Sequence, residues 1–247
     1  MTSFAVTLLS GGLDSTTVTA YAKSRSDRLT AITFQYGQVP SREVVSAVEV
    51  GRLLGVEHRV VDISFLREVA WYSALTNPEA FPLPTGRKPR EMGASIPITY
   101  VPLRNTTFVA LAAAYLESQV LHAIEVEGVA SGEVQVTLYM APNVLDYSGY
   151  PDCRPEFFVQ MSETLRYGSK LGAEYGVEMR IETPIIQMTK AEIAKMGLDL
   201  GAPLEHTWSC YAGGELPCGV CDSCVLRARG FQEAGVPDPL LVRLGVA

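Results

Sequence analysis

The stretch Phe4-Ala5-Val6-Thr7-Leu8-Leu9-Ser10-Gly11-Gly12-Leu13-Asp14-Ser15-Thr16 decides the fold of this chain. Residues 4–9 are mostly apolar and end at turn residues, a pattern that predicts a buried β-strand. Gly11 and Gly12 allow a tight turn, and we expect a helix capped by Asp14 or Ser15 to run to about Lys23. Backbone N–H groups of such a turn, followed by a helix N-terminus, form a site for anions. The stretch predicts a strand, a phosphate-binding loop and a helix, with a plain glycine turn as the alternative.

Strand-like and helix-like segments alternate after this loop. Patterning predicts strands over 29–36, 58–63 and 133–140. It predicts helices over 41–54, 104–120 and 155–175, and a capping box at Thr189 to Glu192 precedes a further short helix. Strands that alternate with helices favour a parallel sheet with right-handed crossovers. We therefore expect an α/β fold with a Rossmann-like, doubly wound parallel sheet.

The remaining segments are irregular in pattern. Residues 75–102 contain six prolines and predict a long loop of the kind that forms lids or binding segments. Residues 142–155 predict a second loop, and from Gly201 the chain is rich in turns and cysteine. We expect an ATP-binding synthase domain over 1–200 and a small zinc-binding segment over 201–247.

Composition restricts the classes of partner. Of the 247 residues, 47% are hydrophobic and 19% are charged, which is ordinary for a globular enzyme. The net charge of −7 argues against a nucleic-acid-coating surface. The longest apolar run, 108–116, falls well short of the ~18 residues of a membrane span. The first 22 residues lack Lys and Arg, so we expect no secretory signal and a cytoplasmic protein.

Four of the five cysteines are clustered near the C-terminus. The spacing Cys210-x7-Cys218-x2-Cys221-x2-Cys224 suits tetrahedral zinc with no open position. An iron–sulfur cluster is the alternative that the spacing leaves open. The three histidines are scattered along the chain, so a histidine-based metal site is not expected.

The loop at 10–16 resembles a known nucleotide site. No lysine follows in the Gly-Lys-Ser/Thr manner of P-loop enzymes. The pattern Ser-Gly-Gly-x-Asp-Ser is similar to the pyrophosphate loop of the ATP-pyrophosphatase superfamily, whose members cut ATP between the α and β phosphates and adenylate a substrate oxygen. The resemblance implies that ATP is bound by Leu8, Leu9, Ser10, Gly11, Gly12, Leu13, Asp14, Ser15, Thr16, Thr17 and Val18.

The same resemblance implies catalytic roles for Asp14, Ser15 and Lys190, with Mg²⁺ held at Asp14. For Lys190, a surface lysine in the first turn of a helix is an equal alternative.

A second polar segment runs from Asp146 to Phe157. It holds three carboxylates, an arginine, two tyrosines and a thiol within twelve residues. A carboxylate pairs with the N–H and amino groups of a guanine-like ring, and an arginine suits a carboxylate ligand. A solvated loop before the helix at Pro155 is the alternative, and the thiol of Cys153 is either inert or catalytic.

Together these motifs resemble the 7-cyano-7-deazaguanine synthase family of queuosine precursor biosynthesis. The residues that carry the resemblance are 10–17, 34–38, 100–102 with 104–105, 146–157, 182–184, 190–193 and 207–227. It implies an adenine nucleotide alpha hydrolase-like fold, a homodimer, and a ligase that turns 7-carboxy-7-deazaguanine and ammonia into the nitrile through an adenylated acid and an amide. It also implies substrate contacts from Tyr36, Gln38, Arg104, Asn105, Asp146, Tyr150, Asp152 and Arg154.

The chain departs from the family pattern in loops around the expected pocket. Val39-Pro40 stands where the family usually has Arg-His, Leu103 where it has Gly, and Ala141-Pro142 where it has Gly-Val. These changes leave two alternatives open: a paralogue that uses a related deazapurine or stops at the amide, and a tRNA-modifying enzyme of the same superfamily. The acidic net charge weighs against the second, because tRNA binding needs many phosphate contacts.

Overall fold

The computed structural model describes residues 1–37, 41–82, 84, 96–145 and 150–246. Its centre is a five-stranded sheet in the order β3-β2-β1-β4-β5, with every neighbouring pair parallel. The strands are β1 (Thr2–Leu8), β2 (Arg28–Gln35), β3 (Glu57–Asp62), β4 (Val134–Tyr139) and β5 (Met179–Glu182). The chain order reverses between β1 and β4, where ligands bind in open sheets of this kind.

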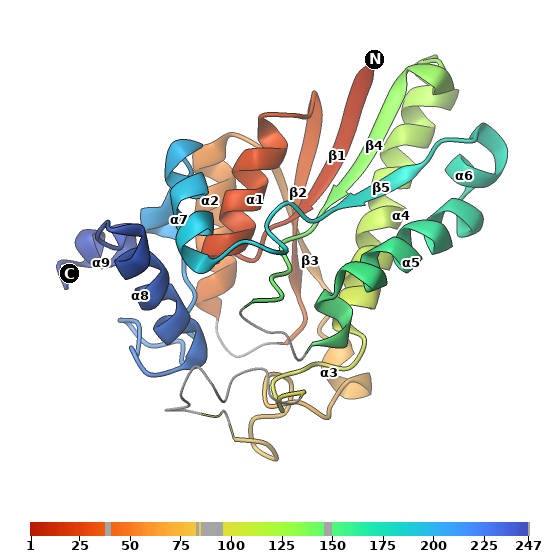
Figure 1. Ribbon diagram of the computed structural model, residues 1–247. Helices are drawn as coiled ribbons and strands as arrows, with labels where there is room; N and C mark the ends of the chain where they lie inside the picture. Colours follow the sequence, from red (N-terminus) through yellow and green to blue (C-terminus); the bar gives the residue numbers. More distant parts are fainter. Residues whose placement is uncertain (38–40, 83, 85–95, 146–149, 247) are drawn as a thin grey trace.

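Helices cover both faces of the sheet (Figure 1). One face carries α1 (Leu13–Lys23), α2 (Ser41–Leu54) and α7 (Lys190–Asp199), with α8 (Asp222–Ala234) and α9 (Pro239–Leu244) outside α7. The other face carries α4 (Arg104–Glu125), α5 (Pro155–Gly168) and α6 (Lys170–Tyr175), and the short α3 (Leu66–Val69) follows β3. Single 3₁₀ turns lie at Ser131–Glu133, Pro151–Cys153 and Leu204–His206. The expected doubly wound α/β fold is confirmed.

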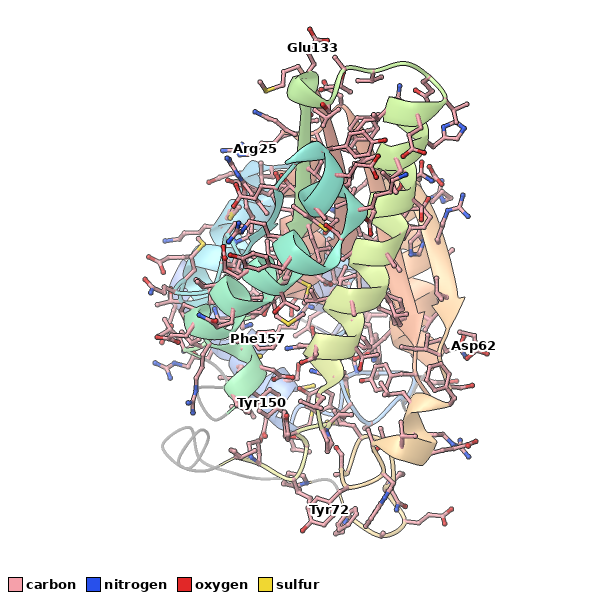
Figure 2. All side chains as sticks on the ribbon, turned by 90° about the vertical axis from the view of Figure 1, so that its right-hand side faces the viewer. Arg25, Asp62, Tyr72, Glu133, Tyr150 and Phe157 are labelled. Carbon is pink, nitrogen blue, oxygen red and sulfur yellow. The ribbon has the colours of Figure 1, made fainter. Side chains whose placement is uncertain are left out.

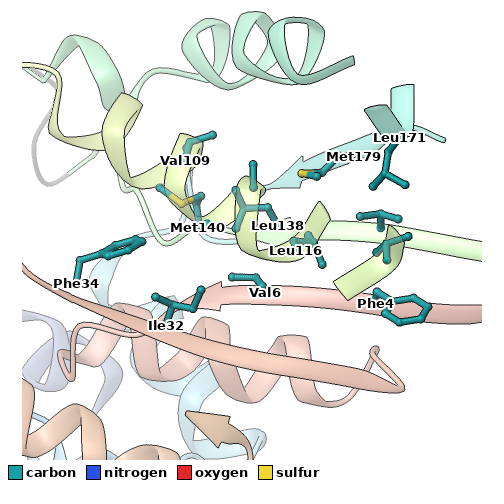
Figure 3. Packing of buried hydrophobic residues seen from close by; sticks show 14 of the residues in the cluster. Phe4, Val6, Ile32, Phe34, Val109, Leu116, Leu138, Met140, Leu171 and Met179 are labelled. Atoms are coloured by element: carbon teal, nitrogen blue, oxygen red, sulfur yellow. The ribbon is translucent and has the colours of Figure 1, made fainter. Parts of the chain in front are cut away.

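Two apolar layers hold the helices to the sheet. On one side, Phe4, Val6 and Leu138 of the sheet pack against Val109 and Leu116 of α4 (Figure 3). On the other, a second cluster joins the sheet to α1, α2 and α7 through Ala5, Leu9, Val18, Val50 and Ile193. Phe4 and Val6 alternate with Ala5 because successive strand side chains point to opposite faces. Strands β1, β2 and β4 therefore contribute to both layers.

Helix α4 is the one helix, among the described residues, long and apolar enough to cross a membrane by length and composition. Its buried residues include Val109, Leu116 and Val120, which belong to the core cluster on the sheet. These residues face the sheet.

Three expected boundaries were wrong. Gly12, not Asp14 or Ser15, is the N-cap of α1, because Leu13 is already helical and the Ser15 hydroxyl bonds within the loop. The helix expected over 155–175 breaks at Ser169, which adopts an extended conformation and caps α6 by accepting a hydrogen bond from Gly172 N. The helix expected to end at Val120 continues to Glu125.

The sequence patterns also missed elements near the C-terminus. Strand β5 has only four residues, too few for a clear alternation. Helices α8 and α9 lie in the segment expected to consist of turns. Ala202, Leu204 and Phe231 share a core cluster with Leu13 and Val18, so apolar packing crosses the proposed domain boundary at residue 200. The division into two domains stays a prediction.

The turn after β1 depends on the absence of a side chain at Gly11. Its φ is +84°, and a Cβ there would lie 2.4 Å from the backbone oxygen of Glu43 and 2.7 Å from the nitrogen of Ala47, both in α2. Its own carbonyl accepts a 2.8 Å hydrogen bond from the Trp208 N–H. Three distant segments therefore meet at one glycine.

We predict that Gly11→Ala lowers the free energy of unfolding by at least about 2 kcal/mol, because the new methyl group meets backbone and the φ is unfavourable for alanine. Denaturant unfolding measures the change. The control is Gly168→Ala at the end of α5, where a Cβ meets nothing within 4 Å. An equal effect of both substitutions would contradict this account of the turn.

Candidate functional site

A cavity of about 350 Å³ opens at the carboxyl end of the sheet. Figure 2 shows Tyr150 and Tyr72 at this end of the molecule and Glu133 at the opposite end. The walls of the cavity come from the loop after β1, the end of β2, the first turns of α2 and α4, the segment after β4, and the chain beyond residue 200. It therefore lies at the reversal point between β1 and β4, where the fold places ligands.

Ser15 fixes the shape of the phosphate loop. Its hydroxyl accepts a 3.1 Å hydrogen bond from Ser10 N, lies 2.9 Å from the Ser10 hydroxyl and is 3.3 Å from the carbonyl oxygen of Gly12. Ser10, Gly12 and Asp14 line the cavity where α1 begins. The loop thus presents hydroxyls and a helix N-terminus to the same space, as an anion site requires.

Lys190 reaches this loop from the first turn of α7. Its ammonium nitrogen lies 2.8 Å from both carboxylate oxygens of Asp14, and its side chain is only 13% exposed. Gly230 of α8 makes room for it, since a Cβ there would lie 2.3 Å from Lys190 Cγ. Thr189 fixes the start of α7 with the expected capping box. Lys190 is therefore a cavity residue and not a surface lysine.

A cationic side chain lies at another part of the cavity. The Arg104 guanidinium is 3.4 Å from the Tyr36 hydroxyl and lies 5.8 Å from its ring centroid. Burial alone would lower the pKa of Arg104, but Tyr36, Tyr150, Asp152 and Cys153 raise that pKa overall. Arg104 therefore keeps its positive charge inside the cavity.

Asp152 and Cys153 support the start of α4. Asp152 accepts hydrogen bonds from the backbone N and side chain of Asn105, at 3.2 and 2.9 Å. Burial raises the pKa of the Asp152 carboxyl and raises that of the Cys153 thiol to about 11. A thiol with this pKa stays protonated at neutral pH, which favours the inert interpretation of Cys153.

The structure brings most of the predicted site residues to one cavity. Among the residues that it describes, the cavity wall includes Leu8, Leu9, Ser10, Gly12, Leu13, Asp14, Ser15, Tyr36, Arg104, Asn105, Tyr150 and Lys190.

Other predicted residues lie elsewhere. Gly11 lies behind the loop against α2, and Thr16, Thr17 and Val18 are fully buried in α1. Asp152 is buried behind Asn105, and Arg154 is exposed outside the cavity. Gln38 and Asp146 lie outside the described residues. Ligand contacts by any of the predicted residues stay predictions.

Sequence reasoning missed several cavity residues. Glu43 comes from the first turn of α2, and burial raises its pKa to about 7 despite the opposing effect of Arg104. No local pattern marked it, because its position depends on α2 folding back over the loop. Trp208, Ser209, Tyr211 and Arg227 also line the cavity. They lie inside the motif at 207–227, in which only the four cysteines were predicted to bind a ligand.

A buried ion pair holds the C-terminal wall in place. Arg227 donates to Asp238 at 2.6 and 2.9 Å, and both side chains are less than 10% exposed. The same guanidinium donates to the hydroxyls of Thr207 and Ser209, at 2.8 and 3.2 Å. It thereby connects α8 and α9 to the chain that faces the phosphate loop.

The four clustered cysteines fit a metal ion. The sulfur atoms of Cys210, Cys218, Cys221 and Cys224 all lie within 4.8 Å of one another, with no disulfide among them. Tetrahedral zinc needs Zn–S bonds of about 2.3 Å, which places sulfurs about 3.8 Å apart. Trp208 and Leu240 cover the cluster with apolar surface. The donor set suits a structural zinc and leaves no position for substrate.

Comparison with known proteins shows the family of this chain. The family model described as "Queuosine biosynthesis protein QueC" matches residues 4–235. The chain belongs to this family. The 7-cyano-7-deazaguanine synthase of Thermoplasma acidophilum is 47% identical over 236 residues, covering 96% of this chain and 90% of the relative. The enzyme of the same description from Trichodesmium erythraeum is 47% identical over 238 residues, covering 96% of this chain and 99% of the relative.

One departure from the family pattern has a structural consequence. Leu103, where the family usually has Gly, is the only non-glycine residue with positive φ in the described part of the chain, at +53°. It directly precedes Arg104, is 64% exposed and is not among the residues that line the cavity. Ala141 and Pro142 do line the cavity, whereas Val39 and Pro40 lie outside the described residues.

We predict that Cys224→Ser removes one bound zinc ion per chain and lowers both the melting temperature and the yield of folded protein. Metal binding at such sites contributes on the order of 10 kcal/mol to folding. Elemental analysis and thermal unfolding provide the measurements. Cys153→Ser is the control and keeps its zinc. Iron in place of zinc, or well-folded protein without metal, would contradict the zinc assignment.

Proposed function

We propose that the chain converts 7-carboxy-7-deazaguanine and ammonia into 7-cyano-7-deazaguanine, with ATP as the activating substrate. The observation that carries the proposal is that one cavity is lined by the phosphate loop, by the Asp14–Lys190 pair and by Arg104 with Tyr36. Relatives named for this product match nearly the whole chain at 47% identity. A carboxylate is a poor electrophile, so it needs activation before ammonia can displace an oxygen.

The phosphate loop serves the activation step. Ser10, Ser15 and the N-terminus of α1 bind the β and γ phosphates, which leave together as pyrophosphate. Lys190 balances their charge, since its ammonium group already faces the loop through Asp14. Asp14 would hold Mg²⁺ through its carboxylate, an oxygen ligand of the kind that this ion prefers, and the ion would neutralise charge on the leaving pyrophosphate. The substrate carboxylate then becomes an acyl adenylate.

The other part of the cavity holds the deazaguanine. The Arg104 guanidinium attracts the substrate carboxylate, and the rings of Tyr36 and Phe108 beside it offer apolar surface to a planar ligand. Tyr150 is held by a 2.7 Å hydrogen bond between its hydroxyl and that of Thr99. Ammonia gives the amide, and a second ATP activates the amide oxygen so that elimination leaves the nitrile.

The proposal also covers the setting of the reaction. The substrates are small molecules and free ammonia, with no nucleic acid, because the net charge is −7. We further propose a homodimer that works in the cytoplasm with a structural zinc. The alternative product is the amide, since Ala141 and Pro142 alter the cavity wall relative to the family pattern.

We predict that Asp14→Ala or Ser15→Ala lowers turnover by roughly two to four orders of magnitude, because preorganised stabilisation of the leaving phosphates is lost. Steady-state kinetics measure the change, and zinc content and fold stay the same. Asp199→Ala, an exposed substitution at the end of α7, serves as the control.

We predict that incubation with 7-carboxy-7-deazaguanine, ATP and ammonium yields the nitrile, with the amide as an intermediate and AMP plus pyrophosphate as the ATP products. Mass spectrometry and nucleotide chromatography resolve these species. Amide that accumulates without nitrile, even with abundant ATP, would support the amide-stopping paralogue. ADP and inorganic phosphate as the sole nucleotide products would refute the pyrophosphate-loop chemistry.

A further inference from the structure

Glu43 is a carboxylate in the cavity wall that has no role in the proposed binding of ATP or of the deazaguanine. It lies in the first turn of α2 and lines the same cavity as Ser10, Asp14 and Arg104. Burial and the charge of Arg104 are the influences on its pKa, and no hydrogen bond from a described residue is among them. The residue is half-buried. A carboxylate that faces a cavity without a hydrogen bond from a described residue is suited to a polar ligand.

The backbone of Glu43 is fixed relative to the phosphate loop. Its carbonyl oxygen packs on Gly11 so closely that a Cβ on the glycine would lie 2.4 Å away. The neighbouring Arg42 places its guanidinium 4.9 Å from the centre of the Trp208 ring and donates to the Glu215 carbonyl at 3.0 Å. The start of α2 is thus held from two sides, which limits the positions open to the Glu43 side chain.

The surroundings place this carboxylate between two halves of the proposed reaction. Its backbone adjoins the loop that binds the ATP phosphates. At the end of the cavity that holds the deazaguanine, Arg104 lowers the pKa of Glu43, and Glu43 raises the pKa of Tyr36. The acyl carbon of an adenylated substrate must lie between these two ends of the cavity. A nitrogen nucleophile that attacks this carbon has to give up a proton. Among the described residues that line the cavity, the other carboxylate is Asp14, which is paired with Lys190.

We propose that Glu43 is the general base that binds the ammonia nucleophile and takes its proton as the amide forms. This assignment rests on the proposed function. The ammonia lone pair forms the C–N bond, the acyl C–O bond breaks, and AMP leaves with that electron pair. One N–H proton passes to the Glu43 carboxylate, and the two remaining hydrogens stay on the amide nitrogen.

Other features agree with this role. With a pKa of about 7, Glu43 is partly ionised at neutral pH, and a base titrating near the working pH transfers protons effectively. Arg104 and Tyr36 are the titratable groups that influence it or respond to it. The half-buried acid Glu49 on the same helix instead pairs with Arg52 at 2.7 Å and lies outside the cavity.

The test separates adenylation from nitrogen attack in Glu43→Gln, with Glu49→Gln as the matched control. Exchange of labelled pyrophosphate into ATP, dependent on 7-carboxy-7-deazaguanine and run without ammonium, measures adenylation alone. We expect this exchange to stay within a few-fold of wild type in Glu43→Gln, whereas amide formation from ammonium falls by roughly 100-fold or more. Glu49→Gln behaves as wild type in both assays.

A second nucleophile distinguishes a base from a residue that only shapes the cavity. Hydroxylamine is largely unprotonated at neutral pH, and its adduct gives up a proton readily to water. Hydroxamate formation by Glu43→Gln should therefore stay within about tenfold of wild type, a smaller loss than the ammonia reaction shows.

Three results would overturn the assignment: wild-type amide formation in Glu43→Gln, equal losses with ammonia and hydroxylamine, or loss of pyrophosphate exchange together with amide formation. Absence of acid-dependent exchange in the wild-type protein is a different result, because it refutes the proposed function itself and the role of Glu43 with it. Thermal unfolding and zinc content of each variant establish that the compared proteins are folded.

Discussion

The close approach of α2 to Gly11 is the constraint on which the rest of this structure depends. At that point the chain turns from β1 into α1, the Glu43 carbonyl packs where a side chain would be, and the Gly11 carbonyl accepts a hydrogen bond from Trp208. The phosphate loop, the first turn of α2 and the C-terminal segment are therefore placed relative to one another by backbone contacts.

The C-terminal segment belongs to the site as much as to the metal cluster. The four cysteines pin a turn-rich stretch, and Arg227, three residues after the last of them, connects α8 to Asp238 and to the hydroxyls facing the cavity. Gly230, one turn further along α8, leaves the space through which Lys190 reaches Asp14. A metal ion held by these cysteines would therefore also support the position of Lys190, because Cys224 and Gly230 lie in the same helix, α8.

Charge inside the cavity is distributed by burial and pairing. Asp14 is compensated by Lys190, and the pKa of Arg104 is raised despite its burial, with the Asp152 carboxylate among the causes, so Arg104 keeps its charge. Glu43 has no such hydrogen-bonded partner among the described residues, and burial raises its pKa to about 7. The cavity therefore combines a cation, an aspartate paired with a lysine, and one carboxylate whose pKa burial raises, a clustering that is typical of functional sites.

The sequence alone determined the parallel sheet, the phosphate loop and the four-cysteine cluster, because each depends on residues close together in the chain: an apolar run, a glycine turn and a regular spacing. It could not place Glu43, the C-terminal wall or the path of Lys190, because these depend on where α2, α7 and α8 pack. It also missed β5 and the break at Ser169, where a four-residue strand and a single cap leave little periodic signal. Neighbouring residues determine the phosphate loop and the cysteine cluster. The shared cavity, in contrast, forms only when tertiary packing brings distant helices against the loop after β1.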